Sequence, residues 1–240
     1  MNIEDLKSEL DQIKDEKYNL LKLVNHDIRS PFNRVFALLQ LFEMESEQPT
    51  ERQKEYMDSM YLSILSGLEM ITNLRDMREI DAGNVETDIS EFDLEGVIQK
   101  SVRSFSKQTE IKHQKIMTHC DLELAPIQSD EYIVQRIMEN VLSNAVKFSK
   151  ANKDIHITLS KDDKSYFVEV QDAGDGIREN EEYLLFKKFR KLSNVSSGGE
   201  GCIGLGLHNT HFFLNKLGGN IHLIRNKKPG SSFIIKFPFQ

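Results

Sequence analysis

Three polar residues, Asn140, Asn144 and Lys147, fall at i, i+4 and i+7 of "SDEYIVQRIMENVLSNAVKF", which reads as one helix. This spacing places all three on one face. Two neutral oxygen donors and one cation on a shared face can hold a Mg²⁺ ion and the phosphates that it bridges. Mg²⁺ takes few protein oxygens and keeps its other positions for water and phosphate. Taken alone, such a segment is more often a solvated polar face.

A second group of residues follows an apolar run in "VEVQDAGDGI", residues 168–177. Asp172, at the end of the expected strand, offers a carboxylate that can accept a hydrogen bond from an exocyclic amine such as that of adenine. Gly174 and Gly176 allow a tight turn and a close approach of the backbone to a flat ring. The D-x-G-x-G spacing is weak by itself, since an ordinary Asp-Gly turn resembles it.

Glycines dominate "SSGGEGCIGLGLHN", residues 196–209, which runs into the start of an expected helix. Exposed N–H groups and the positive end of the helix dipole would make this junction an anion site. A flexible loop followed by a capped helix is the alternative. The spacing matches neither a phosphate-binding loop that ends in G-K-[ST] nor a dinucleotide fingerprint.

Near the N-terminus, "LVNHDIRSPFNRV" places His26 beside Asp27. An imidazole with an unperturbed pKa of ~6.5 is mostly uncharged and nucleophilic near neutral pH. Pro31 lacks the N–H that would bond the carbonyl of residue 27, so we expect a kink in the helix just after His26. A surface His-Asp pair without a chemical role is the usual alternative for such a dipeptide.

Composition limits the classes of protein to which the chain can belong. It has 240 residues, of which 39% are hydrophobic and 29% charged, and a net charge of -7. This balance suits a globular domain and argues against a nucleic-acid partner, which would need a basic face. No run approaches the ~18 apolar residues of a membrane span. Cys120 and Cys202 have no metal-type spacing, so we expect a reduced, cytoplasmic compartment. A membrane sensor region, if the protein has one, would lie outside this chain.

The first eighty residues read as two long amphipathic helices joined by the polar stretch "EMESEQPT". Apolar residues recur at helical spacing on both sides of that stretch, which predicts an antiparallel hairpin over residues 1–80. A hairpin alone cannot enclose its apolar stripes, so we expect it to pair with a second copy into a four-helix bundle. Packing of the hairpin on its own C-terminal domain is the alternative.

Residues 81–92 lack periodicity and are expected to form a linker. Beyond them, residues 93–240 alternate between helical and strand patterns. "DLEGVIQKSVRSF" and "GLGLHNTHFFLNKLGG" read as helices, and "DIHITLS", "SYFVEVQD", "NIHLIRN" and "SSFIIKF" read as strands. The expected fold class is therefore α+β, with a helical hairpin followed by an α/β-sandwich domain.

The order of these motifs is more specific than any one of them. An H-D-x-R-S-P segment, N-x-x-x-N-A-x-K-F, D-x-G-x-G, an F-x-x-F segment at Phe186 and Phe189, and G-L-G-L follow one another along the chain. This arrangement resembles that of the two-component sensor histidine kinases, whose H, N, G1, F and G2 boxes occur in that order. The resemblance implies a dimerisation and histidine-phosphotransfer hairpin followed by an ATP-binding domain of the gyrase-like (Bergerat) type.

The resemblance implies a role for each motif residue toward ATP and Mg²⁺. Asn144 would be the central Mg²⁺ ligand, supported by Asn140. Lys147 would contact phosphate, and Asp172 would contact the adenine amine. The remaining nucleotide-binding positions come from the same motifs: Phe148, Gly174, Gly176, and the phosphate-covering lid residues Gly204, Leu205, Gly206 and Leu207.

On the hairpin, the resemblance makes His26 the phosphorylated residue and Asp27 its hydrogen-bonding partner, which raises the basicity of the attacking nitrogen. Ser30 lies one turn after His26. Family members with a hydroxyl residue there often dephosphorylate their response regulator, although helix packing is an equally good use for a serine.

The expected function is that of a homodimeric, ATP-dependent protein-histidine kinase. It would phosphorylate itself on His26 and pass the phosphoryl group to an aspartate of a response-regulator receiver domain. Related ATPases carry a glutamate four residues before the metal-binding asparagine. Here that position is Asn140, which cannot accept a proton, so we expect slow ATP hydrolysis.

Two other functions compete with this one. The lid sequence "CIGLGL" departs from the family pattern at Cys202 and Ile203. This departure leaves a degenerate core, which dimerises and binds a receiver domain without turnover, as the alternative. A gyrase-like ATPase unrelated to signalling explains neither the His26 motif nor the missing glutamate.

Overall fold

The computed structural model describes residues 32–33, 35–44, 49–120, 122, 125–198, 200–225 and 230–239. His26, Asp27, Ser30 and Pro31 lie outside the described residues, so their roles and the kink after His26 stay predictions. The chain divides into two compact units, Met1–Val85 and Glu86–Gln240.

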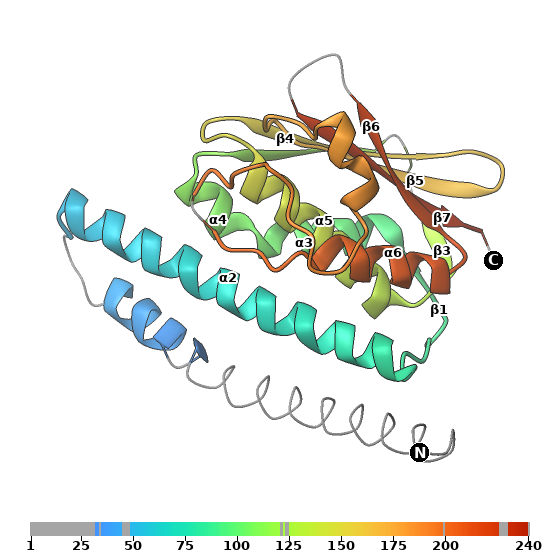
Figure 1. Cartoon of the computed structure of the whole chain (residues 1–240), viewed down its shortest axis with the longest axis horizontal. Helices are drawn as coiled ribbons and strands as arrows, with labels where there is room; N and C mark the ends of the chain where they lie inside the picture. The colour runs from blue at the N-terminus through green and yellow to red at the C-terminus, as the bar shows by residue number, and fades with distance from the viewer. Residues whose placement is uncertain are drawn as a thin grey trace, which may run out of the picture. The chain divides into compact units, whose positions relative to one another are not determined.

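The first unit is helical where it is described. Residues 35–44 form a helix, and α2 (Glu51–Ala82) follows Pro49 (Figure 1). A capping box fixes the start of α2: Gln53 N donates to Thr50 Oγ1 at 3.3 Å, and Thr50 N donates to Gln53 Oε1 at 2.9 Å. The helix ends at Gly83, whose φ of 71° is the left-handed conformation that glycine adopts without strain.

The apolar stripes of the two helices meet inside this unit. Leu39, Met57 and Ile64 form a buried cluster, and the side chains of Phe32, Phe36, Tyr61 and Leu68 pack against it. A further set of apolar side chains stays exposed on the hairpin: Val35, Leu38, Leu41, Phe42, Tyr56 and Met60. One copy of the hairpin therefore does not cover all of its apolar surface.

The second unit is built on a five-stranded sheet with the strand order β2-β4-β5-β7-β6. Its strands are β2 (Lys115–Cys120), β4 (Asp154–Lys161), β5 (Ser165–Gln171), β6 (Asn220–Arg225) and β7 (Ser231–Pro238). The β2–β4 pair is parallel and the other pairs are antiparallel. A separate antiparallel pair joins β1 (Ser90–Asp93) to β3 (Pro126–Ser129).

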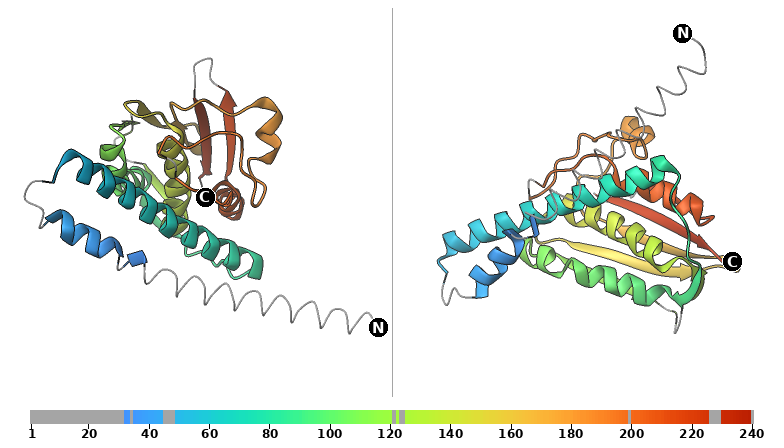
Figure 2. Two further views of the ribbon diagram at one scale, coloured as in Figure 1. Left: turned by 60° about the vertical axis from the view of Figure 1, so that its left-hand side comes forward. Right: turned by 90° about the horizontal axis from the view of Figure 1, so that it is seen from below.

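Helices cover one face of this sheet, as Figures 1 and 2 show for α3 (Leu94–Ser104), α5 (Glu131–Phe148) and α6 (Gly206–Lys216). The short helix α4 (Ser106–Ile111) and the 3₁₀ helix Glu179–Leu184 complete the unit. The core between the layers consists of fully buried aliphatic side chains from α5 and the sheet: Val134, Ile137, Met138, Leu142, Ile155, Ile157, Val168 and Ile235. The predicted α+β class, a helical region followed by a sheet domain, is confirmed.

Candidate nucleotide-binding site

Helix α5 carries the three polar residues of the first motif. The helix begins where Asp130 Oδ1 accepts the N–H of Ile133 at 2.9 Å, and its apolar face packs in the core. Asn140 and Lys147 are buried, whereas Asn144 between them is partly exposed. Asn140 Nδ2 has no hydrogen-bond partner among the described residues. A buried donor in this state needs a further partner, as a residue beside a ligand would have.

The carboxylate of Asp172, directly after β5, is held by its neighbours. Asp172 Oδ1 accepts the N–H of Gly174 at 2.8 Å and the N–H of Ser231 at 3.1 Å. Burial raises the pKa of the Asp172 carboxyl, and the hydrogen bonds from Gly174 and Ser231 oppose that rise. The result is a fixed, dry acceptor, which suits recognition of an exocyclic amine.

The turn after Asp172 packs against the C-terminal end of α5. A Cβ atom at Gly174 would lie 2.6 Å from the carbonyl oxygen of Phe148, so only glycine fits there. Ala173 N donates to Ser149 Oγ at 3.0 Å. Gly176 has a φ of 79°, and its carbonyl accepts the Asn194 side-chain amide at 2.5 Å. The second motif is thus fixed to the first.

The F-x-x-F segment, Phe186 to Phe189, is bonded to the end of the glycine-rich motif and to the start of α6. Phe189 N donates to the carbonyl of Gly204 at 2.9 Å, and a Cβ at Gly204 would lie 2.4 Å from the Arg190 carbonyl oxygen. His208 Nδ1 lies 2.9 Å from the carbonyl oxygen of Phe186. Leu205 is fully buried and α6 begins at Gly206, while Leu207 is half-buried.

The glycine-rich stretch, residues 196–198 and 200–207, is called the lid below, and its last two residues begin α6. The first part of the lid is attached to α5. Ser197 donates two hydrogen bonds to the carbonyl oxygen of Lys147, one from its backbone N at 2.9 Å and one from its Oγ at 3.1 Å. The C-terminal end of α5 therefore meets the Asp172 turn and the lid. The predicted residues that this convergence joins directly are Lys147, Phe148 and Gly174.

Several residues that build the site were not predicted. Ser149 directly follows the first motif, so its position was a usable signal. Asn194 contacts Gly176 from a segment without regular structure. Ser231 reaches Asp172 only because β7 pairs with β5, with Ser232 opposite Gln171, and no local pattern shows that pairing.

The donor set fits a nucleotide with a hard cation. Amide oxygens and phosphate suit Mg²⁺, which needs few protein ligands. Within the described ranges, no cluster of three or more His, Cys, Asp or Glu side chains could hold a metal by itself. A metal here would be held by the side-chain oxygen of Asn144 together with oxygens of the nucleotide.

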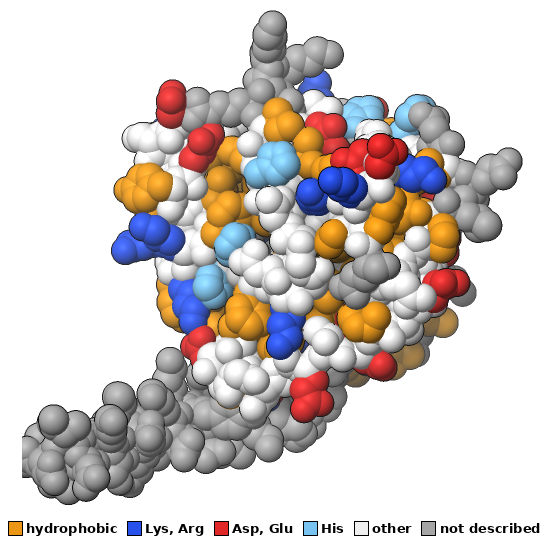
Figure 3. Space-filling model, turned by 90° about the vertical axis from the view of Figure 1, so that its right-hand side faces the viewer, with side chains coloured by type: hydrophobic (Ala, Val, Ile, Leu, Met, Phe, Trp, Pro, Cys, Tyr) orange, Lys and Arg blue, Asp and Glu red, His pale blue; other side chains and the backbone are white. Residues whose placement is uncertain are grey.

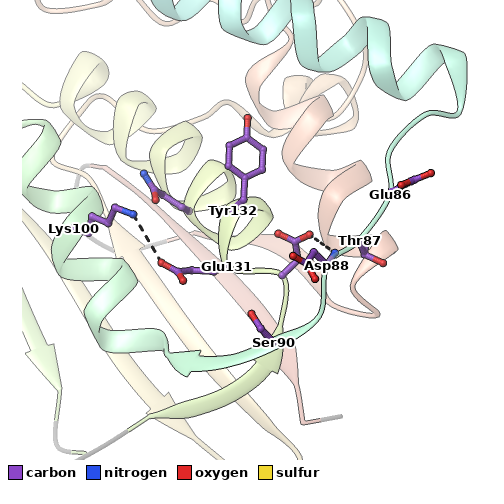
Figure 4. Close-up of a pocket in the computed structure, with 9 residues that line it drawn as sticks. Glu86, Thr87, Asp88, Ser90, Lys100, Glu131 and Tyr132 are labelled. Atoms are coloured by element: carbon purple, nitrogen blue, oxygen red, sulfur yellow. Dashed lines mark hydrogen bonds and ion pairs between the residues drawn. The ribbon is translucent and has the colours of Figure 1, made fainter.

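A hollow in the second unit lies at the other end of α5 (Figure 4). Glu86, Asp88, Lys100 and Tyr132 are among its lining residues, and Lys100 Nζ lies 3.8 Å from Glu131 Oε1. Gln135, the lining residue nearest to Lys147 along α5, precedes it by 12 residues, which is ~18 Å at 1.5 Å per residue. It contains none of the motif residues and is distinct from the candidate site.

On the face drawn in Figure 3, basic side chains are mixed with acidic, histidine and apolar ones rather than gathered in one patch. Of the helices described, none has both the length and the apolar character that crossing a membrane requires.

Comparison with known proteins identifies both halves of the chain. Residues 129–240 match the family described as "Histidine kinase-, DNA gyrase B-, and HSP90-like ATPase". Residues 16–83, which include His26, match the "His Kinase A (phospho-acceptor) domain".

Individual relatives agree with these two matches. The circadian input-output histidine kinase CikA of Synechococcus elongatus is 27% identical over 93% of this chain, which spans 30% of that protein. The sensor histidine kinase YcbM of Bacillus subtilis is 22% identical over 90% of this chain and 70% of its own length.

Solved structures show the same fold. Full-length ShkA, crystallised in complex with AMPPNP, matches with a TM-score of 0.65 and 24% identity. The match covers 92% of this chain and 46% of the ShkA chain. The histidine kinase AdeS of Acinetobacter baumannii has a TM-score of 0.58 and 23% identity over 90% of this chain and 98% of its own. The chain therefore belongs to the sensor histidine kinases, and it carries their catalytic core: a phospho-acceptor domain followed by a gyrase-like ATP-binding domain.

Proposed function

We propose that the chain is an ATP-dependent kinase that phosphorylates itself on His26 and passes the phosphoryl group to an aspartate of a response-regulator receiver domain. The observation that carries this proposal is the convergence at the C-terminal end of α5. There the Asp172 turn and the lid bind to the helix that bears Asn140, Asn144 and Lys147. The family match over residues 16–83, which include His26, supports the choice of acceptor.

Each residue has a part in this reaction. Asp172 would accept a hydrogen bond from the adenine amine, Asn144 would hold Mg²⁺ through its amide oxygen with support from Asn140, and Lys147 would contact phosphate. Bound Mg²⁺ would neutralise charge on the phosphates. One imidazole nitrogen of His26 forms a bond to the γ-phosphorus, the bond from that phosphorus to the bridging oxygen breaks, and ADP leaves. Asp27 accepts the hydrogen bond of the other ring nitrogen.

Hydrolysis of ATP by water should be slow. Asn140 takes the position of a general base but has an amide side chain, which cannot accept a proton. The γ-phosphoryl group is thereby kept for His26. Ser30 would orient a water for dephosphorylation of the receiver domain, a separate activity of the same hairpin.

We further propose that the hairpin pairs with that of a second copy. The exposed apolar side chains on the hairpin, such as Leu38 and Leu41, support this pairing. Burial of apolar surface stabilises by ~25 cal/mol per Å², so covering these side chains favours association.

The Mg²⁺ dependence of ATP affinity tests the site assignment. Calorimetry on the wild type should show at least about tenfold tighter ATP binding with Mg²⁺ than with a chelator, and Asn144→Ala should lose most of this difference. Asn215→Ala is the matched control, because Asn215 is an exposed amide on α6. An unchanged Mg²⁺ dependence in Asn144→Ala would show that the metal ligand lies elsewhere.

A further inference from the structure

We propose that a buried ion pair between Lys112 and Glu200 fastens the lid to the C-terminal end of α5 and thereby sets the affinity for ATP. This inference rests on the proposed function. Lys112 belongs to none of the motifs, Glu200 lies in the glycine-rich segment without a role assigned from the sequence, and the two are 88 residues apart. Both would act as positioning residues, since they fix the backbone beside Lys147 rather than contact the nucleotide.

Lys112, at the end of α4, joins three partners. Its Nζ donates to Glu200 Oε1 at 2.9 Å, to the Val146 carbonyl at 2.6 Å and to the Lys147 carbonyl at 3.2 Å. These three acceptors use all three N–H bonds of the ammonium group. Both side chains of the pair are only 5% exposed. The lysine therefore links the lid to the last turn of α5 in a dry environment.

Glu200 also makes hydrogen bonds within the lid. Its Oε2 accepts the N–H of Gly198 at 3.0 Å, and its carbonyl accepts Ser196 Oγ at 2.9 Å. Ser197, between these two residues, donates to the Lys147 carbonyl. One carboxylate thus organises the first part of the lid and attaches it to the helix that carries the phosphate-binding lysine.

The two charges depend on each other, because burial lowers the pKa of Lys112 and Glu200 opposes that change. A buried charge that loses its partner is strongly unfavourable. Without the ammonium of Lys112, the carboxylate of Glu200 would move to a solvent-exposed position, and the lid backbone would move away from α5 with it. Without the carboxylate, Lys112 keeps its two carbonyl partners, so the fold survives while the lid loosens.

Hydrogen exchange of the nucleotide-free protein measures this attachment directly. In Glu200→Gln, we expect the amides of Ser197 and Gly198 to exchange at least about tenfold faster, with α5 and the sheet unchanged. Lys112→Met should act in the same direction and more strongly. The double variant, Lys112→Met with Glu200→Gln, has no unpaired carboxylate. Its increase in lid exchange should therefore be smaller than the sum of the two single effects.

Glu110→Gln is the matched control. It also removes a glutamate charge near Lys112, but this charge is exposed and its partner, Lys107, lies on the same helix α4 at 3.9 Å. We expect it to leave lid exchange unchanged. In the kinase assay, Glu200→Gln should raise the KM for ATP with kcat within about twofold of the wild type. Wild-type lid exchange in Glu200→Gln would overturn the inference. Exchange does not require phosphorylation, so this outcome is distinct from failure of the proposed function.

Discussion

At the scale of single residues, Asp172, the proposed adenine-binding group, should oppose stability. Burial raises the pKa of its carboxyl in the folded protein. A carboxyl with a raised folded pKa contributes stability below its unfolded pKa and loses that contribution as the pH rises through the folded pKa. Ionisation of the buried side chain therefore costs stability, and the proposed contact with the adenine amine would account for a carboxyl at this position.

Replacing Asp172 by Asn should separate these two effects. Asn keeps an oxygen for the N–H groups of Gly174 and Ser231 but has no charge, so the melting temperature at pH 7.5 should be equal to or higher than that of the wild type. ATP affinity should fall at least about tenfold, the scale of one hydrogen bond to a charged group. Thermal unfolding and calorimetry measure the two quantities.

The matched control for this change is Asp175→Asn on the same turn, where the side chain is 73% exposed and should be neutral in both measurements. Wild-type ATP affinity in Asp172→Asn would contradict the assigned role. A large fall in its melting temperature would contradict the argument from burial.

Gly174 offers a steric test of the same turn. A Cβ atom there would meet the Phe148 carbonyl oxygen at 2.6 Å, so Gly174→Ala must push the turn away from α5. We expect a loss of about 1–3 kcal/mol in unfolding free energy and weaker ATP binding. Gly96→Ala, in the first turn of α3, is the control, because a Cβ there would approach only the side chain of Asp93, at 3.3 Å, which can shift slightly. Equal effects of the two substitutions would show that the close approach is unimportant.

The sequence made some site residues visible and hid others for physical reasons. Asp172, Gly174 and Asn144 belong to local patterns that are weak one by one, and the order of the motifs along the chain was what selected them. Lys112, Glu200 and Ser231 act across distant contacts that exist only after the sheet and the lid have formed. Spacing along the chain carries no signal for such pairs.

At the scale of elements, periodicity predicted the long helices and the inner strands. It failed for β2, because most residues of this edge strand are exposed and "KIMTHC" lacks an apolar alternation. It also failed for α4, whose six residues are too few for a helical pattern. These two elements, which like β1 and β3 were not predicted, flank Lys112, and its contacts could therefore not be seen in the sequence.

The hairpin contains a testable fit between its two helical segments. A Cβ at Gly67 in α2 would lie 2.3 Å from the ring of Phe32, so glycine leaves room for that aromatic side chain. Gly67→Ala should lower the unfolding free energy by about 1 kcal/mol, the low end for overpacking, since the ring can rotate. Combining it with Phe32→Leu should restore part of the loss. If the losses of the two single variants simply add in the double variant, measured by thermal unfolding, the contact between Gly67 and Phe32 does not exist.

At the scale of the whole molecule, the order of the motifs along the chain was enough to indicate the family. Order could not show where the motifs meet, because their convergence on α5 depends on sheet pairing and on lid contacts. The proposed function joins two compact units: one that binds ATP and one that carries the acceptor histidine.

The central claim is that the γ-phosphoryl group of ATP passes to the imidazole of His26. Incubation with Mg²⁺ and ATP labelled at the γ-phosphate tests it most directly. We predict that the protein becomes labelled, that acid releases the label, and that His26→Gln acquires none while it still binds ATP. Label that survives acid, label that persists in His26→Gln, or ATP binding by the wild type without any labelling would contradict the account.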